Sequence, residues 1–208
     1  VREAIESIAG EDVVWVSKES RDAQASARQM SLEIGKRLGW EEKETNVTWL
    51  GRTYNPLIWS GARLYLSAAH NSESLIHDIS RVKDDRYVMV IGMTQKWNLD
   101  ESIAPLIDSH GRIKTIVTEV HGGRNPSISA DVLSDAIFRD SRETLLQIPE
   151  PVDAMDTASK IAVREGCFVF VTGSVYLVGK IIEEKVAREG KDLFQSLEAH
   201  PPREETEG

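Results

Sequence analysis

The chain has 208 residues, of which 40% are hydrophobic and 28% are charged, and its formal net charge is −9. This length suffices for one ordinary domain and part of a second. The acidic balance argues against a nucleic-acid-binding surface, which needs clustered basic residues. No apolar run approaches the roughly 20 residues of a membrane-spanning helix. We therefore expect neither nucleic acid nor a membrane as a partner.

The first predicted elements are a short strand at 13–16 and a helix whose apolar residues recur at helical spacing from Ala23 to Leu38. Polar residues follow and are interpreted as a linker. We place residues 1–45 at the end of one domain and residues 46–190 in a second domain. Residues 191–208, rich in glutamate and proline, are predicted to be a polar tail or linker.

From residue 54 onward, short apolar strands alternate with amphipathic helices, and Ser60-Gly61 indicates a hairpin. The central strands are unbroken apolar runs, which is typical of a mostly parallel sheet with both faces covered. We therefore predict an α/β fold with a Rossmann-like sheet, helices on both faces and an initial hairpin strand. The predicted strands are 57–59, 64–66, 87–91, 115–118, 144–147 and 168–171, and the predicted helices are 75–82, 99–107, 132–137, 155–163 and 175–187.

Sheets of this class bind ligands beyond the carboxyl ends of their strands. Thr172-Gly173-Ser174 joins a strand to a helix, where backbone N–H groups can face an anion, although a helix cap is the commoner role for such a serine. Residues 67–71 also follow a strand, and His70 and Asn71 offer polar groups there. The alternative is a histidine that is structural or solvated. Residues 92–96 and 119–124 occupy equivalent positions after other strands.

Two cations are candidates for phosphate binding, namely Arg52 before the sheet and Lys96 after the 87–91 strand, and the alternative is that both are ordinary surface residues. The histidines do not cluster at metal-ligand spacing, and the chain has no phosphate-loop or dinucleotide-binding motif. We therefore predict no metal site. The single cysteine, Cys167, excludes an internal disulfide and favours a reducing, cytoplasmic location. It opens an apolar strand, so we expect a buried, inert thiol.

Four segments resemble, in the same order, motifs of folylpolyglutamate synthases and dihydrofolate synthases of the Mur-ligase superfamily. The most specific runs from Thr172 to Gly179 and resembles a Gly-Ser-x-Tyr-Leu-Val-Gly signature. Ala69-His70-Asn71 resembles the end of an Asp-Gly-Ala-His-Asn-Pro motif. Trp49-Leu-Gly-Arg52 resembles Trp-Pro-Gly-Arg, and Gly92-Met-Thr-Gln-Lys96 resembles Gly-Met-x-x-Asp/Asn-Lys. The resemblance spans roughly residues 20–187.

This resemblance implies the C-terminal part of an ATP- and Mg²⁺-dependent ligase that joins glutamate to a folate or pteroate carboxylate through an acyl phosphate. It implies catalytic roles for Arg52 and Lys96, with Arg52 at the γ-phosphate. The residues implied at the nucleotide are Arg52, Gln24, Ser67, His70 and Asn71, and those implied at glutamate are Ser174, Tyr176 and His70. The phosphate loop, the Mg²⁺ ligands and the folate-binding loops would lie in an upstream part of the same protein. Since the chain starts at Val1, we expect a piece of that protein, inactive by itself.

The sequence departs from the family pattern on the nucleotide side. Ser67 stands where the family has the aspartate that binds the ATP ribose, and Gln24 stands where it has an asparagine beside the adenosine. A serine hydroxyl cannot accept two hydrogen bonds from a diol as a carboxylate can. Two alternatives therefore stay open. One is a non-catalytic, ligase-like binding or assembly module with a drifted ATP site, and the other is a different Mur-type amino-acid ligase.

Overall fold

The computed structural model describes residues 7, 13, 23–40, 56–82, 85–107, 110–138 and 145–191. The chain divides into two compact units, Val1–Val47 and Thr48–Gly208. In the first unit, helix α2 (Ala23–Leu38) forms where the apolar spacing predicts it. Apart from Val13, the predicted strand at 13–16 lies outside the described residues. The predicted linker after α2 and the predicted tail beyond Lys191 lie outside them as well.

The described part of the second unit forms a six-stranded sheet in the order β1-β2-β6-β3-β4-β5. β1 is antiparallel to β2 and all other neighbours are parallel, which confirms the predicted α/β fold with its hairpin strand. The strands are β1 (Leu57–Trp59), β2 (Ala62–Leu66), β3 (Tyr87–Ile91), β4 (Arg112–Val117), β5 (Leu145–Gln147) and β6 (Phe168–Thr172). The helices are α3 (Ser72–Val82), α4 (Leu99–Ile107), α5 (Ala130–Phe138), α6 (Pro151–Glu165) and α7 (Val175–Glu189).

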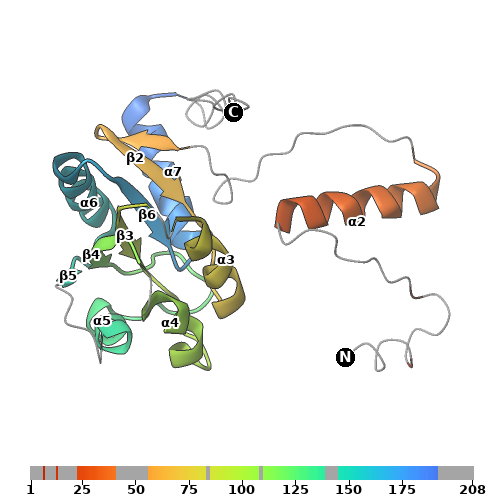
Figure 1. Ribbon diagram of the computed structural model, residues 1–208, viewed down its shortest axis with the longest axis horizontal. Coiled ribbons are helices and arrows are strands. Elements are labelled where there is room, and N and C mark those ends of the chain that lie inside the picture. Colours follow the sequence, from red (N-terminus) through yellow and green to blue (C-terminus); the bar gives the residue numbers. More distant parts are fainter. Residues whose placement is uncertain are drawn as a thin grey trace. The chain divides into compact units, whose positions relative to one another are not determined.

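The sheet is buried on both faces (Figure 1). In β3, Tyr87, Met89 and Ile91 belong to the core shared with α3, α4 and α5, whereas Val88 and Val90 belong to the core shared with α6 and α7. Because successive side chains of a strand point to opposite faces, a strand covered on both sides needs apolar residues throughout. This is why β3 and β6 are unbroken apolar runs.

The order of the strands creates a topological switch point at the carboxyl ends of the central strands. From β2 to β5 the chain passes through α3, α4 and α5, which cover one face; α6 then crosses the other face, and β6 enters between β2 and β3. The helix after β6 therefore leaves on the opposite face from the helices after β2 and β3. Such a switch between adjacent strands is where open α/β sheets bind ligands.

The hairpin strand β1 is fastened to α6 and α7 by a polar clamp. The Trp59 indole N–H donates to Asp156 Oδ1 at 2.7 Å, and Arg188 donates to both Asp156 carboxylate oxygens at 2.8 and 3.0 Å. The Arg188 guanidinium also lies 4.7 Å from the Trp59 ring centroid. The hydrogen bond from Arg188 lowers the pKa of the Asp156 carboxyl below its usual value. The clamp therefore holds the edge hairpin through a charged group that stays ionised.

Five of the described elements, namely β2, α3, β4, α5 and α6, start two to four residues earlier than the sequence predicts, and two of them show why. β4 begins at Arg112 rather than near Thr115, because the buried Arg112 side chain donates to the Leu106 carbonyl at the end of α4 and lies 5.5 Å from the Phe138 ring centroid. Because Arg112 is charged, a search for apolar runs does not include it and places the start of β4 too late. α6 begins at Pro151, where proline suits the first position of a helix because it has no N–H to leave unpaired.

Candidate functional site

Backbone hydrogen bonds join the loops that follow β2, β6 and β3 at the carboxyl ends of these parallel strands, which we term the carboxyl edge of the sheet. The Gly173 N–H donates to the Ala69 carbonyl at 3.0 Å, so the two most specific motifs of the sequence lie side by side. The Gly92 N–H donates to the Thr172 carbonyl at 3.4 Å, which brings the start of the 92–96 loop to the same place. The three segments that the sequence singles out after these strands thus share one edge of the sheet.

Gly173 is required by this close approach. Its φ angle is 101°, a conformation that side chains rarely adopt. A Cβ at this position would lie 2.6 Å from the Gly92 carbonyl oxygen and 2.9 Å from Ile91 Cγ1. The glycine of the Thr172-Gly173-Ser174 turn therefore allows β3 and the loop after β6 to meet.

Ser174 caps helix α7. Its side chain is 2% exposed, and its Oγ accepts the Tyr176 N–H at 3.2 Å, which satisfies one of the free donors at the start of the helix. Tyr176 in the first turn is partly exposed, and its ring edge would lie 3.5 Å from a Cβ at Gly123 in the loop after β4. The cap that the sequence suggests is thus present, and a glutamate-binding role for Ser174 and Tyr176 stays a prediction.

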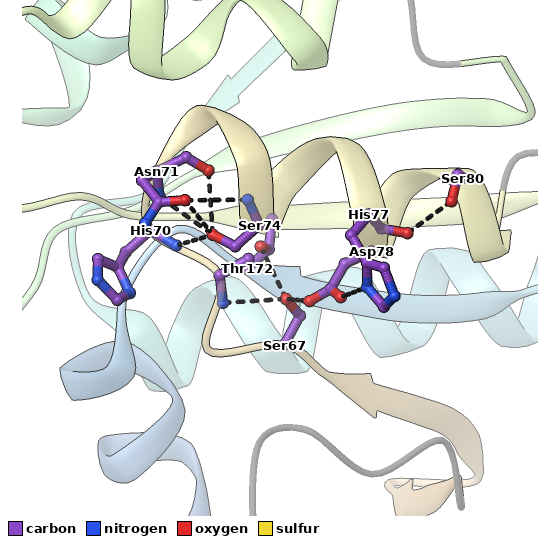
Figure 2. A network of polar contacts seen from close by, with 9 residues as sticks. Ser67, His70, Asn71, Ser74, His77, Asp78, Ser80 and Thr172 are labelled. Carbon is purple, nitrogen blue, oxygen red and sulfur yellow. Dashed lines mark hydrogen bonds and ion pairs between the residues drawn. The ribbon is translucent and has the colours of Figure 1, made fainter. Parts of the chain in front are cut away.

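Ser67, the first residue after β2, is buried at 3% exposure, and its hydroxyl is engaged (Figure 2). Its Oγ–H donates to Asp78 Oδ2 at 2.5 Å, and its Oγ accepts the Ala69 N–H at 3.2 Å. The Oγ also lies 3.3 Å from Thr172 Oγ1 at the end of β6. A carboxylate is therefore present at this edge although the sequence has serine at position 67, and it comes from α3.

Asp78 was not anticipated from the sequence. It lies three residues after the buried Leu75 and one before the buried Ile79, so it occupies the inward stripe of α3. An acidic residue within an apolar stripe is the signal that could have identified it, because a buried carboxylate needs donors nearby. Its second oxygen, Oδ1, accepts the His77 Nδ1–H at 2.9 Å.

The order of these three side chains excludes a hydrolytic triad. In a serine nucleophile, the hydroxyl donates to an imidazole that takes its proton. Here the Ser67 hydroxyl donates to the Asp78 carboxylate, and His77 contacts that carboxylate from the other side. Among the described residues, no imidazole accepts the Ser67 hydroxyl proton, and the arrangement is one of support rather than of a Ser-His-Asp triad.

His70 and Asn71 follow in the same loop and form different hydrogen bonds. The His70 Nδ1–H donates to the Ala68 carbonyl at 2.9 Å, so a neutral ring keeps its lone pair on Nε2, and the ring points away from the Ser67–Asp78 contacts (Figure 2). Asn71 caps α3, because its Oδ1 accepts the Ser74 N–H at 2.9 Å and the Ser74 hydroxyl at 2.8 Å. Ligand contacts by His70 and Asn71 stay predictions.

Lys96 lies in a second group of loops at this edge. The loop after β3 pairs with the loop after β4 through a Thr94–Ser127 bridge and a hydrogen bond from the Gln95 N–H to the Pro126 carbonyl at 2.9 Å. Lys96 is half-buried and forms no ion pair within the described part of the chain, and the next residue, Trp97, is fully exposed. Its catalytic role stays a prediction.

The remaining candidates are not placed by the described residues. Arg52 and the Trp49–Arg52 motif lie outside them, and so does the side chain of Gln24 in α2. Among the residues described, no group of three or more His, Cys, Asp and Glu side chains could hold a metal ion. None of the described helices is long and apolar enough to cross a membrane. Cys167 is buried as expected, and this burial raises the pKa of its thiol.

Comparison with known proteins adds evidence at the level of structure. No protein-family profile matches the chain, and no curated protein matches its sequence. Solved structures do match. Mycobacterium tuberculosis folylpolyglutamate synthase complexed with ADP and AMPPCP is 19% identical, with a TM-score of 0.62 over 80% of this chain and 40% of that one.

Two further solved structures are similar to this chain over a similar share of its length. Escherichia coli FolC in complex with DHPP and ADP is 19% identical, with a TM-score of 0.59 over 80% of this chain and 40% of that chain. Bifunctional folylpolyglutamate synthase/dihydrofolate synthase from Yersinia pestis, complexed with AMPPNP and Mn ion, is 17% identical, with a TM-score of 0.54 over 84% of this chain and 42% of that chain. The chain thus has the fold of the C-terminal part of these proteins and spans about 40% of their length.

Proposed function

We propose that this chain is the C-terminal part of an ATP-dependent ligase that joins glutamate to a folate or pteroate carboxylate through an acyl phosphate. The observation that carries the proposal is the hydrogen bond from Gly173 N–H to the Ala69 carbonyl, at 3.0 Å. It joins the two segments that resemble the family's most specific motifs, at the switch point of a sheet that solved folylpolyglutamate synthases share.

In this proposal the described loops serve the amino acid. The glutamate ammonium first loses one proton to solvent, and the resulting amine attacks the acyl carbon. A C–N bond forms, the C–O bond to the phosphate breaks with its electron pair leaving on inorganic phosphate, and the nitrogen loses its second proton to solvent. The His70 Nε2 lone pair, left free by the Nδ1–H bond to Ala68, accepts a hydrogen bond from the incoming ammonium. Tyr176 borders the same loops, and the buried cap Ser174 holds the start of α7, whose dipole favours a carboxylate.

Lys96 is assigned to the phosphate end, where a cation stabilises negative charge that develops on the leaving group. ATP is the phosphoryl donor. The described residues offer no group of metal ligands, so we assign the Mg²⁺ ligands and the phosphate loop to an upstream domain of the same protein. The Yersinia pestis structure was solved with AMPPNP and Mn ion, which supports nucleotide and metal use in proteins of this fold. Arg52 and Gln24 are assigned to the nucleotide together with the Ser67–Asn71 loop.

A second candidate function is favoured by the burial of Ser67. Its hydroxyl already donates a hydrogen bond to Asp78 Oδ2 at 2.5 Å, so Ser67 has no hydroxyl proton left to donate to a ribose. On this reading the whole protein is a binding or assembly module that has lost nucleotide affinity. Another Mur-type amino-acid ligase, with an amino acid other than glutamate, is the third alternative.

The amino-acid assignment can be tested on the chain itself by NMR. We expect L-glutamate to shift the amide signals of His70, Gly173 and Tyr176 in a ¹⁵N-labelled chain, and His70→Gln to weaken this response. His110→Gln is the matched control, because His110 is an exposed histidine before β4, at the other end of the strands. Shifts confined to other regions would contradict the assignment, and a stronger response to another amino acid would favour a different Mur-type ligase.

A further inference from the structure

The carboxylate of Asp78 has no role in the function proposed above, yet it joins several of the polar contacts at the carboxyl edge (Figure 2). Its Oδ2 accepts the Ser67 hydroxyl at 2.5 Å, and its Oδ1 accepts the His77 Nδ1–H at 2.9 Å. The side chain is only 16% exposed. A carboxylate so far removed from water needs donors to offset its lost hydration, which ties Asp78 to Ser67 and His77.

We propose that Asp78 is a positioning residue. Acting through Ser67, it fixes the peptide group between Ala68 and Ala69, and thereby the tautomer and direction of His70. The inference rests on the proposed function, in which His70 receives the incoming amino acid, but its structural part can be tested without any ligand.

The first step is the direction of the Ser67 hydroxyl. Serine has one hydroxyl proton, and the two acceptors near it are Asp78 Oδ2 at 2.5 Å and Thr172 Oγ1 at 3.3 Å. A hydrogen bond to an ionised acceptor is shorter and stronger than one between neutral groups, so the proton goes to Asp78. A lone pair of the Ser67 Oγ is then free to accept the Ala69 N–H, at 3.2 Å.

The second step passes through one planar peptide group. The Ala69 N–H and the Ala68 carbonyl belong to the same peptide unit, and in a trans peptide they point in opposite directions. When the N–H is held on Ser67, the carbonyl is aimed the other way, where it accepts the His70 Nδ1–H at 2.9 Å. The carboxylate of Asp78 therefore determines, through two intermediates, which nitrogen of His70 carries the proton.

The next peptide unit of the loop is held independently. The Ala69 carbonyl accepts the Gly173 N–H at 3.0 Å, and the His70 N–H donates to Ser74 Oγ at 3.2 Å. Since these contacts fix one side of Ala69 without Asp78, removal of the carboxylate should free the Ala68–Ala69 unit while the bond to Gly173 persists. The effect on His70 is thus specific, and differs from a general loosening of the edge.

The test is the tautomer of His70, read from the ¹⁵N shifts of its ring nitrogens in the ligand-free 208-residue chain. We expect wild type to show the Nδ1–H form, and Asp78→Ala to raise the population of the Nε2–H form about tenfold relative to it, the size expected from the loss of one hydrogen bond to a charged group. Hydrogen exchange at the Ala69 N–H should accelerate about 10- to 100-fold, with a much smaller change at Gly173.

Three variants complete the experiment. Ser67→Ala should reproduce the effect of Asp78→Ala, and the double variant should add nothing further, because both residues act in one chain of contacts. Asp78→Asn keeps an oxygen that accepts the Ser67 hydroxyl, so it should retain the Nδ1–H form. If Asp78→Ala does not fold, Ser67→Ala carries the test, because it removes the same hydrogen bond to the Ala69 N–H. Asp135→Ala is the matched control, since Asp135 is an exposed aspartate on α5.

An unchanged His70 tautomer in Asp78→Ala and Ser67→Ala would overturn the inference, and so would additive effects in the double variant. Failure of the proposed function is seen separately. If the tautomer responds as expected while L-glutamate leaves the wild-type amide signals unmoved, the positioning role of Asp78 stands and the amino-acid assignment falls.

Discussion

The loops after β2 and β6 differ from the loops after β3 and β4, although all of them meet at the carboxyl edge of the sheet. In the first pair, the buried side chains of Ser67, Thr172 and Ser174 are all engaged in hydrogen bonds with side chains or backbone. In the second pair, the loops are joined mainly through backbone contacts such as the Thr94–Ser127 bridge, and Trp97 is fully exposed. The buried hydrogen bonds of the first pair hold its loops in one conformation. The second pair leaves side chains such as Trp97 exposed, where they can contact a ligand.

This comparison has a direct consequence for mutations. Changes in the loops after β2 and β6 should lower stability, because they leave buried polar groups unpaired or force backbones apart. Substitutions of exposed side chains in the loops after β3 and β4 should leave the free energy of unfolding nearly unchanged and instead alter ligand binding or turnover.

The largest effect is expected at Gly173. Gly173→Ala places a Cβ 2.6 Å from the Gly92 carbonyl oxygen at a φ angle of 101°, so we expect the free energy of unfolding to fall by about 2–4 kcal/mol in urea denaturation. Gly179→Ala is the control, since nothing lies within 4 Å of a Cβ there, and it should stabilise helix α7 by up to about 1 kcal/mol. Equal stability of the two variants would contradict the close approach at the edge.

An intermediate effect on stability is expected at the polar clamp of Trp59, Asp156 and Arg188, which lies outside the two pairs of loops. Asp156→Ala removes the acceptor of the buried Trp59 indole and the partner of Arg188, so we expect a loss of about 1–2 kcal/mol, limited by the exposure of the ion pair. Urea midpoints of the two proteins at neutral pH measure this loss.

The same clamp gives a pH dependence with a defined sign. The pKa of Asp156 is lowered in the folded chain, so the carboxylate contributes stability above its unfolded pKa of about 3.9, and this contribution is lost as the pH falls through the folded pKa. The stability difference between wild type and Asp156→Asn should therefore be constant from about pH 5 to 7 and shrink below about pH 4. A difference that grows on acidification would be incompatible with the Arg188 contact.

The smallest effect on stability is expected in the loops after β3 and β4. Lys96→Gln and Trp97→Ser should each change the free energy of unfolding by less than about 0.5 kcal/mol, because Trp97 is fully exposed and the half-buried Lys96 forms no ion pair with the described residues. If Lys96 acts on the leaving phosphate, Lys96→Gln should still reduce turnover of the longer protein by about 10- to 1,000-fold. A destabilised Lys96→Gln chain would break the distinction between the two pairs of loops.

The elements of this fold could be predicted because each has a local signal. Strands such as Tyr87–Ile91 are unbroken apolar runs, and helix α4 shows its inward residues at helical spacing. Their spatial order carries no such signal. The insertion of β6 between β2 and β3 depends on α6 crossing the far face, which no local pattern encodes, and this insertion is what brings residues 67–71 beside residues 172–174.

Side-chain roles were predictable only in part. The capping role of Ser174 follows from its place between a strand and a helix, and the cap is present. Asn71 caps α3, a role not assigned to it from the sequence, while its nucleotide contact stays a prediction. The carboxylate at the β2 end comes from Asp78, eleven positions later than Ser67 in the sequence. Such a contact depends on how α3 packs against the sheet, so it could be found only in three dimensions.

The most direct test of the proposed function is ADP release by a longer protein that contains this chain together with its upstream domain. The proposal predicts ADP release that requires both glutamate and a folate or pteroate substrate, that falls about 10- to 1,000-fold in Lys96→Gln and that is absent from the 208-residue chain alone. No ATP binding at all would contradict a ligase and favour a binding module. ATP binding without glutamate-dependent turnover would contradict a ligase that uses glutamate. Glutamate-dependent ADP release by the 208-residue chain alone would contradict the assignment of the phosphate loop to an upstream domain.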